Sequence, residues 1–142
     1  MRYRVIKFRT MVPNAEALTG PVWASERDAR VTGVGRLLRR FHLDEIPQVI
    51  NVVRGEMSLV GPRPERPVLS EQFSGYIPGF SRRLLVRPGI AGLAQLRGHY
   101  ATNPADKLRY DILYISNMSP WLDIKILALT AILMRKLSWK GQ

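Results

Sequence analysis

Two adjacent carboxylates, Asp44 and Glu45, are the side chains of this sequence best suited to chemistry. Pro47 follows them and is typical of the first turn of a helix, so we expect Asp44 at or beside a helix N-terminus. The helix dipole and the unpaired N–H groups there favour an ionised carboxylate, which could act as a nucleophile or bind a cation. Adjacent helix residues point in different directions, so the two carboxylates could serve two reactants. The plain alternative is a solvated helix cap without a catalytic role.

Arginines on either side of this pair could supply the fixed positive charges that phosphoryl transfer requires. Arg39 precedes Asp44 by little more than one helical turn. Arg63 lies in the sequence Gly-Pro-Arg-Pro at 61–64, where two prolines stiffen the backbone. The Lys-Phe-Arg-Thr-Met segment at 7–11 adds two further basic residues. Taken singly, each of these is more often a solvated surface group than a ligand.

Other common catalytic patterns are missing from the sequence. The chain has no cysteine, which excludes disulfides, thiolate metal sites and cysteine nucleophiles. His42 and His99 are its two histidines, and they have no metal-ligand spacing. Gly33 and Gly35 lack the third glycine and the lysine of a nucleotide-binding loop. No Gly-x-Ser-x-Gly is present, which weakens a serine hydrolase interpretation.

The composition predicts one folded, strongly basic domain over residues 1–142. The chain has 22 Lys and Arg against 11 Asp and Glu, a formal net charge of +11 and a hydrophobic fraction of 46%, which excludes an intrinsically disordered chain. Such a charge requires an anionic partner: nucleic acid, an anionic membrane surface or a phosphorylated substrate. The acidic residues are concentrated at 41–80, between two basic stretches. This distribution suits a cation site within an anion-binding surface.

The elements that must hold these side chains are predicted to be short and mainly helical. The pattern of apolar and turn-forming residues predicts strands at 3–8 and 93–97, helices at 13–18, 35–40, 43–53, 67–73, 106–115 and 121–137, and stiff turns at 61–64 and 87–92. The fold class is therefore α/β mixed (α+β), helix-rich with a few short strands. Apolar residues nearly encircle the last helix, which indicates burial or contact with lipid. Its longest uncharged apolar run is too short to cross a bilayer.

Four motifs carry a resemblance to a known family. They read Lys-Phe-Arg-Thr-Met at 7–11, Leu-Asp-Glu-Ile-Pro-Gln at 43–48 with Asn-Val at 51–52, Gly-Glu-Met-Ser-Leu-Val-Gly-Pro-Arg-Pro at 55–64 and Arg-Pro-Gly-Ile-Ala-Gly-Leu-Ala-Gln at 87–95. In this order, the chain resembles the bacterial sugar transferases, which are polyprenyl-phosphate glycosylphosphotransferases or monotopic phosphoglycosyl transferases. The resemblance continues through 106–111 and 122–127 and so covers nearly the whole chain. It implies a catalytic domain associated with the membrane interface.

The resemblance implies transfer of a sugar 1-phosphate from a UDP-sugar to undecaprenyl (polyprenyl) phosphate, with release of UMP. In the family, the aspartate of the Asp-Glu pair, here Asp44, attacks the sugar-bound phosphorus and becomes a phosphosugar ester. The glutamate, here Glu45, is expected to position or deprotonate the acceptor. The resemblance also implies a Mg²⁺ ion, with Asp44 as its protein ligand. The product would initiate exopolysaccharide, capsule or O-antigen assembly.

Matching motif positions imply further substrate-binding residues, at Lys7, Arg9, Arg39, Pro62, Arg63, His99 and Asp123. His99 stands where the family commonly has arginine, so its charge would depend on protonation. The family also carries an N-terminal membrane helix ahead of the Lys-Phe-Arg-Thr-Met segment, and we expect this chain to be an N-terminally truncated catalytic domain. The implied location is the cytoplasmic face of the bacterial inner membrane, as a peripheral or monotopic protein.

Two alternatives to a working transferase stay open on the sequence. The first is a non-catalytic basic module that binds nucleic acid or anionic membrane, with Asp44 and Glu45 only as a helix cap. The second is a truncated homologue that folds but is inactive. A transferase requires no nucleic acid partner, and it would lose UMP release on Asp44→Asn. A binding module would keep its function after that substitution and would lose affinity steeply with salt.

Overall fold

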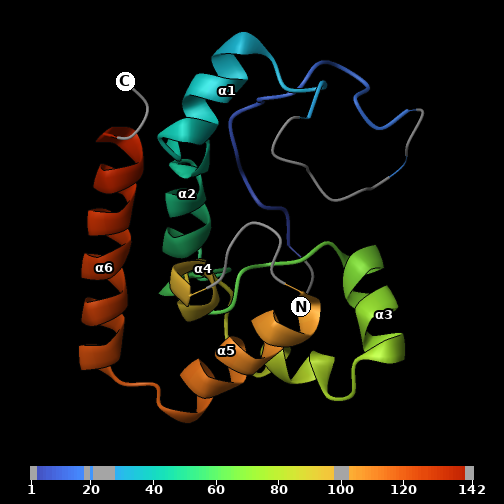
Figure 1. The fold of residues 1–142 in the computed structure, drawn as a ribbon. Coiled ribbons are helices and arrows are strands. Elements are labelled where there is room, and N and C mark those ends of the chain that lie inside the picture. Colours follow the sequence, from blue (N-terminus) through green and yellow to red (C-terminus); the bar gives the residue numbers. More distant parts are fainter. Residues whose placement is uncertain (1–2, 18–19, 21–27, 98–102, 140–142) are drawn as a thin grey trace.

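The computed structural model describes residues 3–17, 20, 28–97 and 103–139. Its helices are α1 (Gly33–Arg40), α2 (Gln48–Val53), α3 (Pro67–Tyr76), α4 (Leu93–Arg97), α5 (Pro104–Ser116) and α6 (Pro120–Trp139), with 3-10 helices η1 (Leu43–Glu45) and η2 (Phe80–Leu85). The strands are β1 (Ser58–Val60) and β2 (Gly89–Ala91). This arrangement confirms the helix-rich α/β class (Figure 1).

The two strands form a small parallel sheet, in which Ser58 pairs with Gly89 and Val60 with Ala91. The connection between them contains α3 and η2. The pairing extends past the strands, because the Gly61 N–H donates to the Ala91 carbonyl at 2.9 Å and the Gly89 N–H donates to the Pro62 carbonyl at 3.0 Å. A side chain on Gly61 would lie 2.5 Å from the Arg87 carbonyl oxygen, so only glycine allows this approach.

Two apolar clusters hold the helices in place. The first surrounds the sheet and consists of buried Val60, Ala91, Tyr114 and Ile126, so it joins both strands to α5 and α6. The second lies beside it and consists of Phe73, Ile77 and Phe80, which join α3 to η2. Figure 1 shows the result: α5 runs across the lower part of the molecule, between α6 and α3. The sheet and the loops at its ends are therefore fixed from several sides.

The predicted strand at 3–8 is wrong, because this segment forms no ladder with another strand. Its N–H groups find other acceptors: the Ile6 N–H donates to the Asn51 side chain at 3.0 Å, and the Phe8 N–H donates to the Asp44 carbonyl at 3.0 Å. The alternation of apolar and basic residues therefore reflects an extended segment that crosses η1 and α2. It does not reflect a strand at the edge of a sheet.

Two other predicted elements are also wrong. Residues 93–97 form helix α4, because Gln95 and Leu96 both donate their N–H groups to the Gly92 carbonyl and start a helical turn directly after β2. The segment at 13–17 forms turns, since Asn14 has a φ of 56° and a left-handed residue interrupts a helix. The predicted helix end at residue 18 lies outside the described residues.

The remaining predicted helices are present with shifted ends. The helix expected at 43–53 is divided into η1 and α2, and Asp44 lies in η1, so it precedes the α-helix instead of starting it. The helix α6 buries Ile126 in the core but exposes Trp121 and Ile132. Within the described ranges, no helix combines the length and apolar character that crossing a bilayer requires.

Candidate active site

The Glu45 carboxylate is held between two cations from distant parts of the chain. The Lys7 Nζ donates to Glu45 Oε1 at 2.9 Å, and the Arg63 guanidinium binds both carboxylate oxygens, with Nη1 to Oε2 at 3.2 Å. Both cations are partly exposed, whereas the Glu45 side chain is only 10% exposed. Burial alone would raise the pKa of Glu45, but the hydrogen bonds and charges of Arg63 and Lys7 lower it to about 2.

Asp44 stands next to this ion cluster with its carboxylate unengaged. Its backbone carbonyl accepts the Phe8 N–H at 3.0 Å, which fixes the main chain of η1. No hydrogen bond or ion pair from the described residues reaches its side chain. His42 precedes η1 in the left-handed region, with a φ of 53°, and turns the chain after α1. The structure thus separates the two carboxylates: Glu45 is tied to cations, whereas Asp44, which is also buried with 9% of the residue exposed, has no partner for its carboxylate among the described residues.

The segment that carries Lys7 is fixed by Asn51, a motif residue to which the sequence assigned no role. Asn51 is fully buried in α2 and accepts the Ile6 N–H at 3.0 Å. Its amide donates to the Arg4 carbonyl at 2.8 Å and to a Glu56 carboxylate oxygen at 2.6 Å. A lone amide within the apolar run at 49–53 is the sequence signal that could have identified it.

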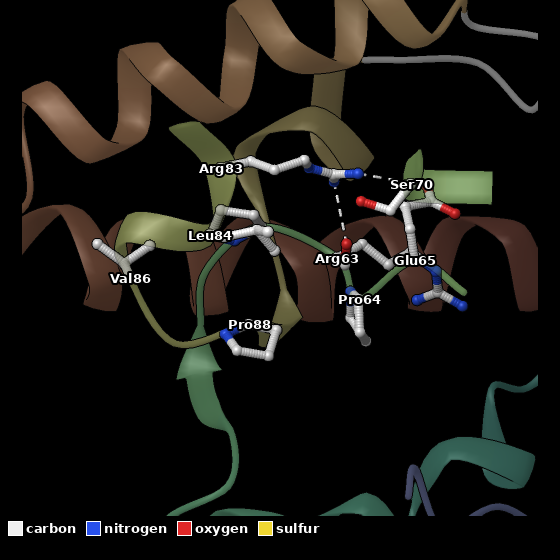
Figure 2. A pocket seen from close by; sticks show the side chains of 9 residues that line it. Arg63, Pro64, Glu65, Ser70, Arg83, Leu84, Val86 and Pro88 are labelled. Atoms are coloured by element: carbon white, nitrogen blue, oxygen red, sulfur yellow. Dashed lines mark hydrogen bonds and ion pairs between the residues drawn. The ribbon is translucent and has the colours of Figure 1, made fainter. Parts of the chain in front are cut away.

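Arg63 is presented by the loop that follows β1. Pro62 is buried, and its carbonyl accepts the Gly89 N–H, so the loop is attached to β2. The loop also borders a small cavity of about 40 Å³, which is lined in part by Arg83 and Pro88 (Figure 2). Arg83 is 4% exposed and donates to the Arg63 carbonyl at 3.0 Å. A buried arginine of this kind was not identified from the sequence.

The other predicted site residues occupy different surroundings. Arg39 donates from Nε to the Thr10 hydroxyl at 2.8 Å, and α1 approaches the Thr10 backbone closely at Gly35. Arg9 is exposed, and no interaction with another described residue is assigned to its side chain. His99 lies outside the described residues. The structure therefore brings Lys7 and Arg63 to Glu45 but does not link Arg39 or Arg9 to it.

Asp123 belongs to a separate surface near the sheet. Its carboxylate accepts the Tyr114 hydroxyl at 2.8 Å, and the same hydroxyl lies 3.3 Å from the Val60 carbonyl. Asp123 lines an open depression of about 370 Å³ together with Arg87, Leu127 and neighbouring residues of β1. No hydrogen bond or ion pair joins Asp123 to the Glu45 cluster among the residues that the structure describes.

Known proteins provide an independent comparison for this chain. A family model described as bacterial sugar transferase matches residues 1–136. The UDP-N-acetylgalactosamine-undecaprenyl-phosphate N-acetylgalactosaminephosphotransferase of Aeromonas hydrophila is 45% identical over 127 residues, which cover 87% of this chain and 30% of that protein.

Two relatives whose names specify UDP-glucose are similar to this chain at a comparable level of identity. The UDP-glucose:undecaprenyl-phosphate glucose-1-phosphate transferase of Klebsiella pneumoniae is 44% identical over 134 residues, which cover 89% of this chain and 28% of that protein. The protein of the same name in Caulobacter vibrioides is 42% identical over 135 residues, covering 90% of this chain and 49% of that protein. This chain thus spans less than half the length of the three relatives. The match over residues 1–136 and these identities show that the chain belongs to the bacterial sugar transferase family.

Proposed function

We propose that this chain catalyses transfer of a sugar 1-phosphate from a UDP-sugar to undecaprenyl phosphate, with release of UMP. The names of its relatives give the sugar-phosphate donor class and the lipid acceptor. The observation that carries the proposal is the contrast between the two adjacent carboxylates. Glu45 is engaged by Lys7 and Arg63, whereas Asp44 has no partner among the described residues.

Asp44 is the proposed nucleophile. One of its carboxylate oxygens attacks the phosphorus that carries the sugar, the phosphorus–oxygen bond to the rest of the nucleotide breaks, and UMP leaves with the bridging oxygen. A phosphate oxygen of undecaprenyl phosphate then attacks the same phosphorus. The bond to Asp44 breaks, so the carboxylate is restored and the sugar is linked to the lipid by a diphosphate. Division of one displacement into two covalent steps is a common use of carboxylate nucleophiles.

Glu45 is better suited to orienting cations than to removing a proton. A general base works best with a pKa near the working pH, and the pKa of Glu45 is lowered to about 2. Its carboxylate instead fixes Lys7 and Arg63, whose partly exposed side chains can still contact a phosphate. Held cations stabilise charge on phosphoryl oxygens without reorganisation during the reaction. Glu45 could position the acceptor or deprotonate it. This geometry supports positioning, through the Lys7 and Arg63 side chains that Glu45 holds.

A Mg²⁺ ion fits this proposal through Asp44. Among the described residues, no group of three or more acidic or histidine side chains could hold a metal. Mg²⁺ in phosphoryl-transfer sites is commonly bound by one or two carboxylates together with substrate phosphates, so one available carboxylate is sufficient. When bound, the ion would draw negative charge from the phosphoryl oxygens. Asp44 would supply the protein ligand.

The proposed reaction takes place at a membrane surface, because its acceptor is a lipid. Exposed apolar side chains such as Val53, Trp121 and Ile132, together with the net charge of +11, suit contact with anionic lipid. We place the chain at the cytoplasmic face of the inner membrane, where its product would initiate exopolysaccharide, capsule or O-antigen assembly. Substrate contacts from Arg9, Arg39, Pro62, His99 and Asp123 remain predictions.

The test is luminescent detection of UMP from a panel of UDP-sugars with undecaprenyl phosphate and Mg²⁺. Wild type is compared with Asp44→Asn and with Asp106→Asn, an equal change of charge at an exposed carboxylate of α5. Each is assayed as this chain and as a fusion behind an N-terminal membrane helix. We expect one UDP-sugar to give UMP with wild type and Asp106→Asn only. Absence of UMP with every sugar in both formats would overturn the proposal in favour of an inactive homologue or a basic binding module.

A further inference from the structure

Arg83 is a charged residue that lies almost completely inside the protein. It is 4% exposed and is located in η2, with its guanidinium 5.0 Å from the centre of the Phe80 ring. Its Nη2 lies 2.8 Å from a carboxylate oxygen of Asp111 in α5, and this carboxylate is itself buried. Arg83 also lies 3.6 Å from the Glu65 carboxylate. One side chain therefore links η2, α5 and the loop between β1 and α3.

Stability does not account for this buried pair. Removing two charges from water costs more than their attraction usually returns, and apolar replacements of similar volume are often at least as stable. Burial raises the pKa of Asp111 to about 6, although Arg83 lowers it. Since this value lies above the ordinary value of 3.8, ionisation of Asp111 at neutral pH works against folding. A buried pair of this kind is weak evidence for stabilisation, so its geometry is the better guide to its role.

The pair provides a fixed donor for the Arg63 backbone. Arg83 donates from Nη2 to the Arg63 carbonyl at 3.0 Å, and Figure 2 shows its side chain extended toward this loop, with interactions to Arg63 and Glu65. Pro62 and Pro64 flank Arg63 and restrict its backbone, so a hold on the Arg63 carbonyl fixes the point from which the Arg63 side chain starts toward Glu45. The Arg63 guanidinium in turn binds Glu45.

We propose that Arg83 is a positioning residue: by holding the Arg63 carbonyl, and being held by Asp111, it keeps the Arg63 guanidinium against Glu45. The role in catalysis rests on the proposed function, whereas the placement of Arg63 does not. The nearby charges are consistent with this role. Lys107 of α5 lies close enough to Glu65 and Asp111 to interact with both, so neither carboxylate depends on Arg83 alone for a compensating charge.

The test replaces both members of the pair, Arg83→Met together with Asp111→Leu, since one substitution alone would leave the other buried charge without its nearest partner at 2.8 Å. The first readout is independent of activity: hydrogen exchange of the Arg63 Nη–H groups, measured by nitrogen-15 NMR and assigned with Arg63→Lys. We expect exchange to become roughly tenfold faster or more in the double variant, because a freed guanidinium is exposed to water. Val31→Ala, a buried position in the bridge to Met11 and outside the clusters around η2, is the control for general loosening and should keep the wild-type exchange rate.

The second readout is kcat/KM for UMP release. A small displacement of a positioning group can lower rates by roughly tenfold to a hundredfold, and we expect such a loss in the double variant with the melting temperature retained. In an Arg63→Ala background, the same pair of substitutions should cost less than about twofold, since the residue through which Arg83 acts is gone. Unchanged Arg63 exchange in the double variant would overturn the proposal. Faster exchange in the double variant, together with no UMP release by wild type, would overturn only the proposed function.

Discussion

The side-chain oxygen of Asn51 accepts a hydrogen bond from the Ile6 N–H at 3.0 Å, across 45 positions of sequence. Lys7 follows Ile6 and donates to Glu45 at 2.9 Å. The backbone beside this lysine is thus fixed by an amide on α2, the helix that follows η1 and the two carboxylates. Asn51 uses both its acceptor and its donors, so the N-terminal segment is anchored to the part of the chain that carries the candidate catalytic pair.

Substitution of Asn51 should weaken both the fold and the site. Asn51→Ala leaves the partly buried Ile6 N–H and the Arg4 carbonyl without their partner, and we expect the free energy of unfolding to fall by about 2–3 kcal/mol. Urea denaturation provides the measurement. Asn117→Ala is the control, because the Asn117 amide donates to the Leu113 carbonyl at an exposed position, and it should change stability by less than about 0.5 kcal/mol. Equal effects of the two substitutions would contradict the anchoring role.

Glu45 should make the protein sensitive to acid. Its pKa is lowered from 4.5 to about 2 in the folded state, so its contribution to stability is present above pH 4.5 and is lost as the pH falls from there toward 2. The loss should be on the order of 3 kcal/mol for a shift of this size. Urea unfolding across this pH range should therefore show a steeper loss for wild type than for Glu45→Gln. Parallel curves for the two proteins would show that the ion cluster does not stabilise the fold.

Substitution by alanine should have opposite effects on stability at Gly89, where the two strands approach closely, and at Gly75, where there is open space. A Cβ on Gly89 would overlap the Gly61 nitrogen and would lie 2.5 Å from the Val60 carbonyl carbon, so Gly89→Ala should destabilise the protein by about 3 kcal/mol. Gly75, in α3, has nothing within 4 Å of the added atom. Because alanine is the better helix former, Gly75→Ala should raise stability by about 0.5–1 kcal/mol. Thermal unfolding of the two variants measures both effects, and a neutral Gly89→Ala would show that the sheet can open without cost.

The Tyr114 hydroxyl should stabilise the first apolar cluster. Tyr114 is 2% exposed, and its hydroxyl reaches Asp123 at 2.8 Å and the Val60 carbonyl at 3.3 Å. Tyr114→Phe keeps the ring and removes these bonds, so we expect a loss of about 1–2 kcal/mol in chemical denaturation. Tyr76→Phe is the matched control, since Tyr76 is 60% exposed, and it should be near neutral. A Tyr114→Phe protein as stable as wild type would indicate that the hydroxyl contributes nothing to the cluster.

Much of the helical part of the fold follows from the sequence, but the sheet does not. Helix α5 could be predicted because Asn103 and Pro104 mark its start and apolar residues repeat at helical spacing. The strands have three residues each, and no alternation can be recognised over so short a length. Their partners are also distant in sequence, and parallel pairing leaves no local turn signal. The basic and apolar alternation at 3–8 has the period of a strand without a strand beside it.

The candidate site could also be predicted from the sequence only in part. The carboxylate pair is visible in the sequence because two acidic residues precede a helical proline, but its environment is determined by tertiary contacts. Spacing alone could not show that Glu45 is engaged while Asp44 has no partner among the described residues, since the cations that bind Glu45 come from segments before and after it. The motifs include Asn51 without a role and do not include Arg83, because both residues act by binding backbone groups, which spacing does not reveal.

The parallel pairing of β1 with β2 determines when the site can form during synthesis. Glu45 leaves the ribosome before Arg63, yet the loop that holds Arg63 is fixed only after Gly89 has donated its N–H to Pro62 and Asp111 has reached Arg83. Until then chain entropy opposes closure of the long connection between β1 and β2, which contains α3 and η2. A nascent chain that ends before α5 therefore carries both carboxylates without the full set of contacts that place Arg63. The acidic pair is made early, and its surroundings are completed by the last third of the sequence.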